Sequence, residues 1–401
     1  MLDLETALAR VLAALPPPRA ETLPLTAAAG RVLAESIGSP SDLPLFDNSA
    51  MDGYAVRAAD IRNAKPDAPV TLRIKARIPA GEFYSGEIIA SECARLFTGS
   101  PMPRGADAVV MQEDTRVDPA RPDEVQICDA ARLGENVRRQ GEDVRKGTQL
   151  LEAGSVITPG AIGLLAAAGV KDVSVGQPAR VGLLATGSEL CEPGRPLQPG
   201  QIYESNRAML APLVTNAGGI PKVFPVVPDT LAETRLAQER AFAESDFVIT
   251  SGGVSVGEMD FVKSAFESLG GKMEFWKVAI RPGRPFVFGR LGEKFLFGLP
   301  GNPVSAFVTF LLLVRPALRR WQGAQETALP AHPAVLGEAI SNSGDRRHFV
   351  RVRVDDAGKV FSTGKQASHV LGSLAVADGL LDLSPQTTLP AGAAVRVLRV
   401  V

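Results

Sequence analysis

Three short loops, rich in glycine and hydroxyl groups, carry the residue types best suited to binding an oxyanion. They are Thr186-Gly187-Ser188-Glu189, the segment from Ser251-Gly252-Gly253 to Asp260, and Pro300-Gly301-Asn302-Pro303. Glycine lets backbone N–H groups approach a ligand, and a helix that starts after such a loop adds the positive end of its dipole. One loop of this kind is as well explained as an ordinary turn, but three together favour a phosphate or oxyanion site.

Carboxylates accompany these loops. Glu189 and Asp260 belong to two of them, and Asp229 follows a further predicted strand at 223–227. Beside a phosphate, such groups are typical ligands of Mg²⁺. Each one alone is more often a helix cap or a solvated charge, because Asp commonly starts helices. The sequence therefore offers them as candidate magnesium ligands and leaves the simpler role open.

Basic residues gather around a Pro-Gly turn that contains Lys277, Arg281 and Arg284. Guanidinium groups offer planar forks to an anion and an ammonium group offers a point charge, so the turn suits anion binding. Surface charges on a hairpin are the alternative.

Two polar loops lie in the N-terminal part of the chain. The segment 47–54 is polar but interrupted by apolar residues, unlike an ordinary solvated loop, and we interpret it as an active-site loop that contributes Asp52. The segment 134–143 places Arg138 and Arg139 among carboxylates. It holds an anion or locks its domain to a neighbour, and the sequence gives both readings equal weight.

The elements that must position these residues alternate between short apolar runs and helical patterns. Runs at 181–186, 247–250 and 295–299 precede the three loops and predict strands, and the helical patterns between them indicate an α/β layer with a largely parallel sheet. Helices are predicted at 231–243 and 261–269, and after Asn206 and Asn302, each expected to cap its helix. The carboxyl ends of parallel strands converge on one crevice, where ligands bind. That crevice is the candidate site.

Bulk properties exclude several classes of protein. The net charge is −1 without long basic runs, so neither nucleic acid nor an anionic membrane is an expected partner. An acidic N-terminus and the lack of a long apolar run predict a cytoplasmic protein. Cys93, Cys128 and Cys191 are too few and too scattered for a disulfide framework, and with three histidines they predict no protein-held transition metal. A soft metal handled here must find its ligands on the substrate.

In order along the chain, the motifs at 47–54, 97–99, 105–110, 186–190, 251–260 and 299–303 resemble MoeA, the molybdopterin molybdenumtransferase family, which also includes the E domain of gephyrin. The likeness runs over essentially the whole chain. It implies a homodimer with four domains per chain and a site between subunits. The implied domains are a Rossmann-like α/β molybdopterin-binding domain similar to MoaB and MogA proteins (1–20 and 178–327), a linking domain (21–42 and 145–177), a β-rich domain (43–144) and a C-terminal β-barrel-like domain (328–401).

The resemblance also implies the reaction: molybdate is inserted into adenylylated molybdopterin with Mg²⁺ as helper ion, and AMP is released. Carried over by motif, the catalytic candidates are Asp52, Thr98, Asp143, Glu189, Asp229 and Asp260, of which Glu189, Asp229 and Asp260 would hold Mg²⁺. The substrate-binding candidates are Arg138, Gly187, Ser188, Ser251, Gly252, Gly253, Lys277, Arg281, Pro300, Gly301, Asn302, Pro303, Arg351 and Ser368. Implied partners are molybdopterin adenylyltransferase and the proteins that mature molybdoenzymes.

One departure from the family concerns the Pro-Gly turn, where many relatives carry lysines and this chain has Arg281 and Arg284. Arginine favours planar, bidentate contacts, so selectivity between molybdate and tungstate is open. Two alternative functions remain open: a non-catalytic scaffold of the gephyrin type, which the charged residues of these motifs disfavour, and a molybdopterin adenylyltransferase, which would consume ATP.

Overall fold

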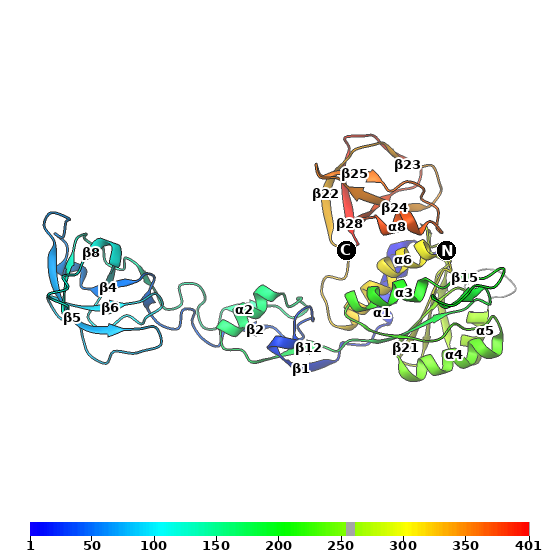
Figure 1. The fold of residues 1–401 in the computed structure, drawn as a ribbon. Coiled ribbons are helices and arrows are strands. Elements are labelled where there is room, and N and C mark those ends of the chain that lie inside the picture. Colours follow the sequence, from blue (N-terminus) through cyan, green and yellow to red (C-terminus); the bar gives the residue numbers. More distant parts are fainter. Residues whose placement is uncertain (254–260, 401) are drawn as a thin grey trace. The chain divides into compact units, whose positions relative to one another are not determined.

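The computed structural model describes residues 1–253 and 261–400, and the chain divides into two compact units. Unit 1 comprises residues 1–35, 153–158 and 173–401, and unit 2 comprises residues 36–152 and 159–172 (Figure 1). Each unit has its own hydrophobic core. The finer division into four domains stays a prediction.

A six-stranded sheet forms the centre of unit 1, in the order β16-β13-β17-β21-β20-β18. The first four strands are parallel, and β20 and β18 extend the sheet in antiparallel pairing at one edge. The largely parallel sheet predicted from the sequence is therefore confirmed, with an antiparallel edge added. The bounds are β13 Arg180–Ala185, β16 Ile220–Val223, β17 Phe247–Ser251, β18 Lys272–Trp276, β20 Val287–Leu291 and β21 Lys294–Leu299.

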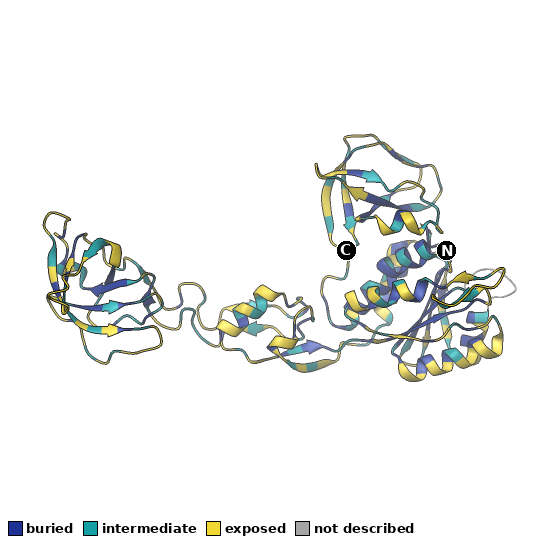
Figure 2. Cartoon of the chain, viewed as in Figure 1, coloured by how far each residue is buried: buried dark blue, intermediate teal, exposed yellow. Residues whose placement is uncertain are grey.

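Helices cover both faces of this sheet because successive strand residues point to opposite sides. Phe247 and Ile249 join one core with the helices on the first face, while Val248 joins a second core with the helices on the other. Figure 2 shows the outward surface of α4 exposed and the strands beneath it buried. The first face carries α1 Leu4–Ala14, α3 Asn206–Asn216, α6 Pro303–Thr309 and α7 Arg315–Trp321, and the second carries α4 Leu231–Glu244 and α5 Phe261–Ser268.

One continuous helical segment runs from Pro303 to Trp321. A π-helical turn, η4 (Phe310–Val314), separates α6 from α7, and its apolar side chains are largely buried. The helix predicted after Asn302 is therefore confirmed. No helix in the described part of the chain is both long enough and apolar enough to cross a membrane.

The strand predicted at 223–227 is placed too late in the chain. The strand β16 ends at Val223, and the residues after it form a loop in which Val227 makes one isolated parallel bridge, to Thr186, and Phe224 and Val227 are buried against the second core. Pro225 and Pro228 lack the backbone N–H that a sheet ladder requires, which accounts for the early end. The apolar residues mistaken for a strand are packing residues of this loop.

The C-terminal part of unit 1 forms a second six-stranded sheet, in the order β19-β24-β25-β22-β28-β26, in which β24 also pairs with β26. This closed arrangement agrees with the predicted barrel-like domain. The strand β19 comes from the basic turn after β18 and pairs with β24 at Arg347 and His348. The bounds are β19 Ile280–Arg281, β22 Ala331–Leu336, β24 Arg347–Val354, β25 Lys359–Ser362, β26 Gly379–Leu383 and β28 Ala394–Arg399, with the extra pair β23 Ile340–Asn342 and β27 Thr387–Leu389 and the helix α8 Leu371–Ala375.

Unit 2 is β-rich, as the sequence predicted, and its main sheet has the order β7-β4-β6-β5-β9-β8. The bounds are β4 Gly53–Val56, β5 Val70–Ile78, β6 Glu92–Leu96, β7 Ala108–Met111, β8 Thr115–Arg116 and β9 Glu124–Ile127. Two short strand pairs, β3 Asn48–Ser49 with β10 Val137–Arg138 and β2 Ile37–Gly38 with β11 Gln149–Leu151, and the helix α2 Pro159–Ala167 complete the unit. Short elements elsewhere are β1 Ala20–Pro24, β12 Asp172–Gly176, β14 Leu190–Cys191 and β15 Ile202–Tyr203.

Candidate functional site

The three glycine loops of unit 1 begin at the same level of the sheet. Ala185, Ser251 and Leu299 are register partners on the adjacent parallel strands β13, β17 and β21. The next residues stay linked, because the Thr186 N–H donates to the Ser251 carbonyl at 3.2 Å and the Gly252 N–H donates to the Leu299 carbonyl at 3.3 Å. The loops therefore leave the sheet side by side, as expected for a ligand crevice.

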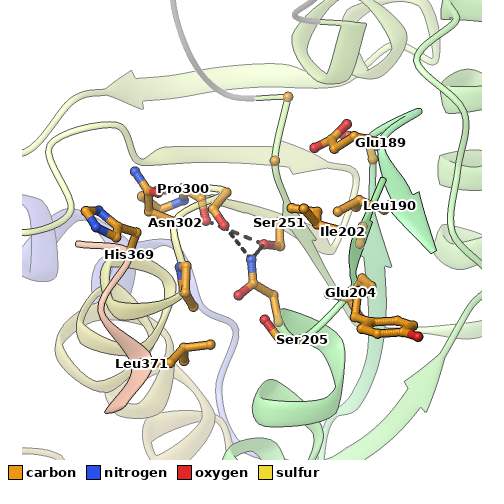
Figure 3. A pocket seen from close by; sticks show the side chains of 18 of the residues that line it. Glu189, Leu190, Ile202, Glu204, Ser205, Ser251, Pro300, Asn302, His369 and Leu371 are labelled. Atoms are coloured by element: carbon orange, nitrogen blue, oxygen red, sulfur yellow. Dashed lines mark hydrogen bonds between the residues drawn. The ribbon is translucent and has the colours of Figure 1, made fainter. Parts of the chain in front are cut away.

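A cleft of about 620 Å³ lies over these strand ends. Figure 3 shows Glu189 on one side of the cleft and His369 and Leu371, from the C-terminal part of the chain, on the other. The lining residues are Ala185, Thr186, Glu189, Leu190, Ile202, Tyr203, Glu204, Ser205, Asn206, Ser251, Gly252, Gly253, Pro285, Pro300, Gly301, Asn302, Pro303, His369 and Leu371. Two helices, α3 and α6, start at this cleft and direct their positive ends to it.

Glycine is required at two positions of the Ser-Gly-Gly loop. Gly252 and Gly253 have φ angles of +89° and +63°, in the left-handed region that favours glycine. A Cβ atom on Gly252 would lie 2.7 Å from the Thr186 carbonyl oxygen, and one on Gly253 would lie 2.8 Å from the Thr186 hydroxyl. These two glycines let the loop after β17 pass directly against the loop after β13.

Asn206 ties the loops to helix α3. Its side-chain amide donates to the Ser251 hydroxyl at 2.6 Å and to the Gly301 carbonyl at 2.7 Å. The sequence predicted Asn206 as a helix cap, and this is wrong: Ser205 occupies the cap position and Asn206 is the first helical residue. The predicted cap at Asn302 is in place, but its side chain makes no capping hydrogen bond.

Several polar groups of the cleft remain open to a ligand. The Thr186 hydroxyl and the Asn206 carbonyl oxygen Oδ1 are buried and have no hydrogen-bond partner among the described residues. No hydrogen bond within the described chain occupies the backbone N–H groups of Gly301 and Asn302. Buried polar groups are normally paired, so this set suits a ligand with both acceptors and donors.

The carboxylates near the cleft in unit 1 differ in whether they already form hydrogen bonds or ion pairs. Glu189 is exposed in the cleft, and Gly187 makes room for it, since a Cβ atom there would lie 2.7 Å from the Glu189 carboxylate. Glu204 is 4% exposed and forms an ion pair at 3.1 Å with the buried Arg207. Asp229 accepts the Ser188 N–H at 2.9 Å and does not line the cleft. Glu189 is therefore the free carboxylate of this wall.

A metal-binding cluster is not evident in the part of the chain that the structure describes, where no three His, Cys, Asp or Glu side chains come together in a way that could hold a metal ion. The candidate ligand Asp260 lies outside the described residues.

The basic turn lies beside the cleft and contributes Pro285 to its lining, while Lys277 and Arg281 are not among the lining residues. Lys277 has a φ angle of +71°, and its ammonium nitrogen lies 4.3 Å from the centre of the Trp276 ring. Arg281 pairs in register with His348, whose pKa is lowered to about 4, first by burial and then by the charges of Arg281, Arg351 and Arg346. The turn thus meets a positively charged part of the C-terminal domain.

Arg351 is fully buried, and its guanidinium group holds a chain segment. It donates to the Ser373 hydroxyl at 2.9 Å and to the carbonyl oxygens of Lys365 at 2.8 Å and Ala367 at 3.2 Å. The Ser368 carbonyl in turn accepts the Val304 N–H at the start of α6. The structure gives Arg351 the role of fixing the segment that carries His369 to the cleft, and contact with an anion stays a prediction.

In unit 2, Asp52 and Thr98 form a pair. The Asp52 carboxylate accepts the Thr98 backbone N–H at 2.8 Å and the Thr98 hydroxyl at 2.9 Å, and these two hydrogen bonds, in that order, lower the pKa of Asp52. Gly53 follows at a point where a Cβ atom would lie 2.0 Å from the Val110 carbonyl oxygen, so only glycine allows this close approach.

Arg138 and Asp143 flank a segment that is hydrogen-bonded to Asp47, at the start of the same loop. Arg138 pairs with Asn48 between β10 and β3, and both candidate side chains are exposed. Asp47 fixes the segment between them by accepting the Gln140 N–H at 2.7 Å. The structure therefore gathers the unit 2 candidates around one loop.

Sequence reasoning missed Glu204, Ser205, His369 and Leu371 as cleft residues. His369 directly follows the candidate Ser368, but the sequence alone does not show which neighbour of a motif faces a ligand. Asn206 was noticed and given the wrong role, because its partners come from loops 45 and 95 residues away.

Comparison with known families gives consecutive matches along nearly the whole chain. The family described as MoeA N-terminal region (domain I and II) matches residues 2–169, the probable molybdopterin binding domain matches residues 182–320, and the MoeA C-terminal region (domain IV) matches residues 333–400.

Individual relatives agree with these matches. The molybdopterin molybdenumtransferase 2 of Mycobacterium tuberculosis is 44% identical over 90% of this chain and 90% of its own length. The molybdopterin molybdenumtransferase of Haemophilus influenzae is 40% identical over 93% and 92%. A crystal structure of the molybdopterin biosynthesis MoeA protein from Pyrococcus horikoshii superimposes with a TM-score of 0.83 at 32% identity and covers 99% of both chains.

Proposed function

The chain belongs to the MoeA family, and from this premise we propose that it is a molybdopterin molybdenumtransferase, which inserts molybdenum from molybdate into adenylylated molybdopterin and releases AMP. The observation that carries the proposal is the cleft over the level ends of β13, β17 and β21, with its unpaired donors and acceptors. The curated relatives have molybdopterin and molybdenum in their names, while the adenylylated form of the substrate is our own inference.

Two kinds of open groups support this substrate. The free N–H groups of Gly301 and Asn302, at the positive end of α6, suit the oxygens of a phosphoanhydride. The unpaired Asn206 Oδ1 and Thr186 hydroxyl suit N–H donors of a heterocycle such as a pterin. A ligand with a phosphate at one end and a pterin at the other satisfies both sets.

Magnesium fits as an ion that arrives with the phosphates. Mg²⁺ usually binds to one or two carboxylates plus substrate phosphates and keeps several waters, so the free carboxylate of Glu189 is compatible with it. When bound, the ion would neutralise charge on the phosphoanhydride. We propose Glu189 as its ligand, with Asp229 placing the Ser188 backbone nearby, and Asp260 remains a candidate.

We propose that Asp52, Thr98, Asp143 and Arg138 of unit 2 are also required for turnover. In this scheme Asp52 orients or deprotonates a reacting group, and Thr98 keeps it ionised. Lys277 and Arg281 hold the oxyanion, and the basic surroundings of the turn support this role.

We further propose that the protein is a homodimer, which light scattering would test. We also propose that it works in a reducing compartment such as the cytoplasm, where the free thiols of Cys93, Cys128 and Cys191 are stable.

The deciding experiment measures AMP release from adenylylated molybdopterin by the purified protein with Mg²⁺, with and without molybdate. Molybdate-dependent AMP release, with molybdenum retained on the pterin, supports the transferase. No AMP release under any condition would favour a non-catalytic scaffold, and ATP-dependent adenylylation of molybdopterin would favour an adenylyltransferase.

Two variants test the residues. Asp52→Ala is expected to abolish molybdenum insertion while the oligomeric state is retained, and full activity would remove the 47–54 loop from the site. Lys277→Ala is expected to raise the molybdate concentration needed for half-maximal rate, whereas an unchanged molybdate response would make this lysine purely structural.

A further inference from the structure

Helix α7 carries a largely buried arginine without an ion-pair partner among the described residues. Arg319 is 9% exposed, and its Nε atom is buried without a hydrogen-bond partner. No ion pair to a described residue involves Arg319, and burial lowers its pKa. Buried charges are normally paired with an opposite charge, so this arrangement favours an anion nearby.

Arg315 lies one helical turn before Arg319 and also carries a guanidinium group without an ion-pair partner among the described residues. Its guanidinium group donates to the Thr327 carbonyl at 2.9 Å and forms no ion pair with a described residue. Burial and, second, the like charge of Arg319 lower the pKa of Arg315. Two positive charges therefore lie close together on one face of α7 without a described carboxylate to balance them.

A second pocket, of about 450 Å³, opens beside Arg315 and is separate from the cleft. It lies between the α/β sheet domain and the C-terminal strands of unit 1. Its lining contains three groups that are or can become cationic, Arg315, His332 and Arg399, and no Asp or Glu. The remaining lining is mainly apolar: Leu213, Ala217, Leu311, Leu329, Pro330 and Val400, together with Asn216.

Among the described residues that line the pocket, the opposing electrostatic contribution of a helix end is weaker than these charges. Helix α3 ends at the pocket, and a helix C-terminus carries about half a negative charge. The Ala217 carbonyl at this end already accepts the Gln322 side-chain amide at 2.9 Å. Arg315, Arg319 and Arg399 carry three full positive charges against it, so the local potential is positive.

We propose that this pocket binds a small organic anion, a phosphate or carboxylate group on an apolar body. The anionic group pairs with Arg315 and Arg399, and the apolar body contacts Leu213, Leu311 and Leu329. This site does not depend on the proposed transferase reaction, because it shares no lining residue with the cleft.

Calorimetric titration of the full chain with phenyl phosphate and with inorganic phosphate tests the proposal. The apolar walls predict that phenyl phosphate binds about tenfold more tightly than inorganic phosphate. Arg315→Gln is expected to weaken phenyl phosphate binding at least about tenfold, and Arg399→Gln, at an exposed position, to weaken it as well. Arg320→Gln is the matched control, because Arg320 is exposed on the same helix and does not line the pocket.

The oxyanion site proposed at Lys277 and Arg281 would also bind phosphate, and Arg281→Gln separates it from this pocket. If both bind, Arg281→Gln removes one binding event and Arg315→Gln removes the other. The proposal is overturned if Arg315→Gln and Arg399→Gln, both folded by circular dichroism, bind phenyl phosphate like the wild type. It is also overturned if no anion binds and Arg315→Gln alone dissociates an oligomer, because a second copy then supplies the counter-charge.

Discussion

The Asn206 side-chain amide donates to the Ser251 hydroxyl across 2.6 Å and thereby joins the start of α3 to the end of β17. The same nitrogen reaches the Gly301 carbonyl, so one side chain connects three chain segments at the floor of the cleft. The positions of two loops of the proposed site therefore depend on the side chain of Asn206.

Replacing Asn206 should damage both stability and activity. Asn206→Ala leaves the Gly301 carbonyl without its donor, and we expect a loss of about 1–3 kcal/mol in the free energy of unfolding. AMP release should fall about tenfold or more, because the loops lose their common anchor. Urea unfolding and the AMP assay measure the two effects. Asn63→Ala, at an exposed position in unit 2, is the control, and equal behaviour of both variants would refute the anchoring role.

Gly252→Ala tests the close passage of two loops. A Cβ atom at this position meets the Thr186 carbonyl at 2.7 Å in a left-handed backbone, so we expect destabilisation by more than about 2 kcal/mol and loss of AMP release. Gly270→Ala is a matched control, because Gly270 has a φ angle of +86° and no heavy atom within 4 Å of its Cβ position. That variant isolates the backbone cost of about 1 kcal/mol. Similar losses in both variants would show that crowding at Thr186 is irrelevant.

The pair formed by Asp52 and Thr98 predicts a pH effect. Because hydrogen bonds from Thr98 lower the pKa of Asp52 below its ordinary value of 3.8, the carboxylate stays ionised to more acidic pH. Thr98→Val removes the hydroxyl donor and should raise this pKa, so the acidic limb of the activity profile should move to higher pH. Carboxyl NMR of Asp52 measures the shift directly. Thr148→Val, at an exposed position of unit 2, should leave the resonance in place.

His348 predicts an acid-sensitive C-terminal domain. Its pKa in the folded chain is lowered to about 4 from 6.5, so the unfolded chain binds more protons between these values. Stability should therefore decrease as the pH falls from 6.5 to 4, by at most about 3 kcal/mol from this group. His348→Gln should flatten this dependence in urea unfolding between pH 7 and pH 5, while His332→Gln, at an exposed histidine, should not. An identical pH dependence in wild type and His348→Gln would contradict the assignment.

The sequence predicted the elements whose pattern is local. The buried strands at 181–186, 247–250 and 295–299 appear as continuous apolar runs because helices cover both faces of a parallel sheet. The helices after Asn206 and Asn302 were found from their periodicity and their start signals, and the gathering of three glycine loops followed from a general property of parallel sheets.

What could not be predicted depends on partners that are distant in sequence. The strand at 223–227 was misplaced, because Phe224 and Val227 look like strand residues and are buried as loop residues. The hydrogen bonds from the Arg351 guanidinium group to Ser373 and to the Lys365 carbonyl could not be read from the sequence either, while its Nη1 atom is buried without a partner among the described residues. Burial of a charged group depends on the final packing, which no local pattern contains.

The shared register of β13, β17 and β21 limits how this family can change its length. Alternate residues of β17 face different cores, so removing one residue would turn Val248 and Ile249 to the wrong sides and shift Ser251 away from its neighbours. Insertions and deletions are therefore expected to accumulate in the opposite connections and in the surface helices. We therefore expect the number of residues in these three strands to stay constant among relatives, even where the apolar side chains that fill them differ.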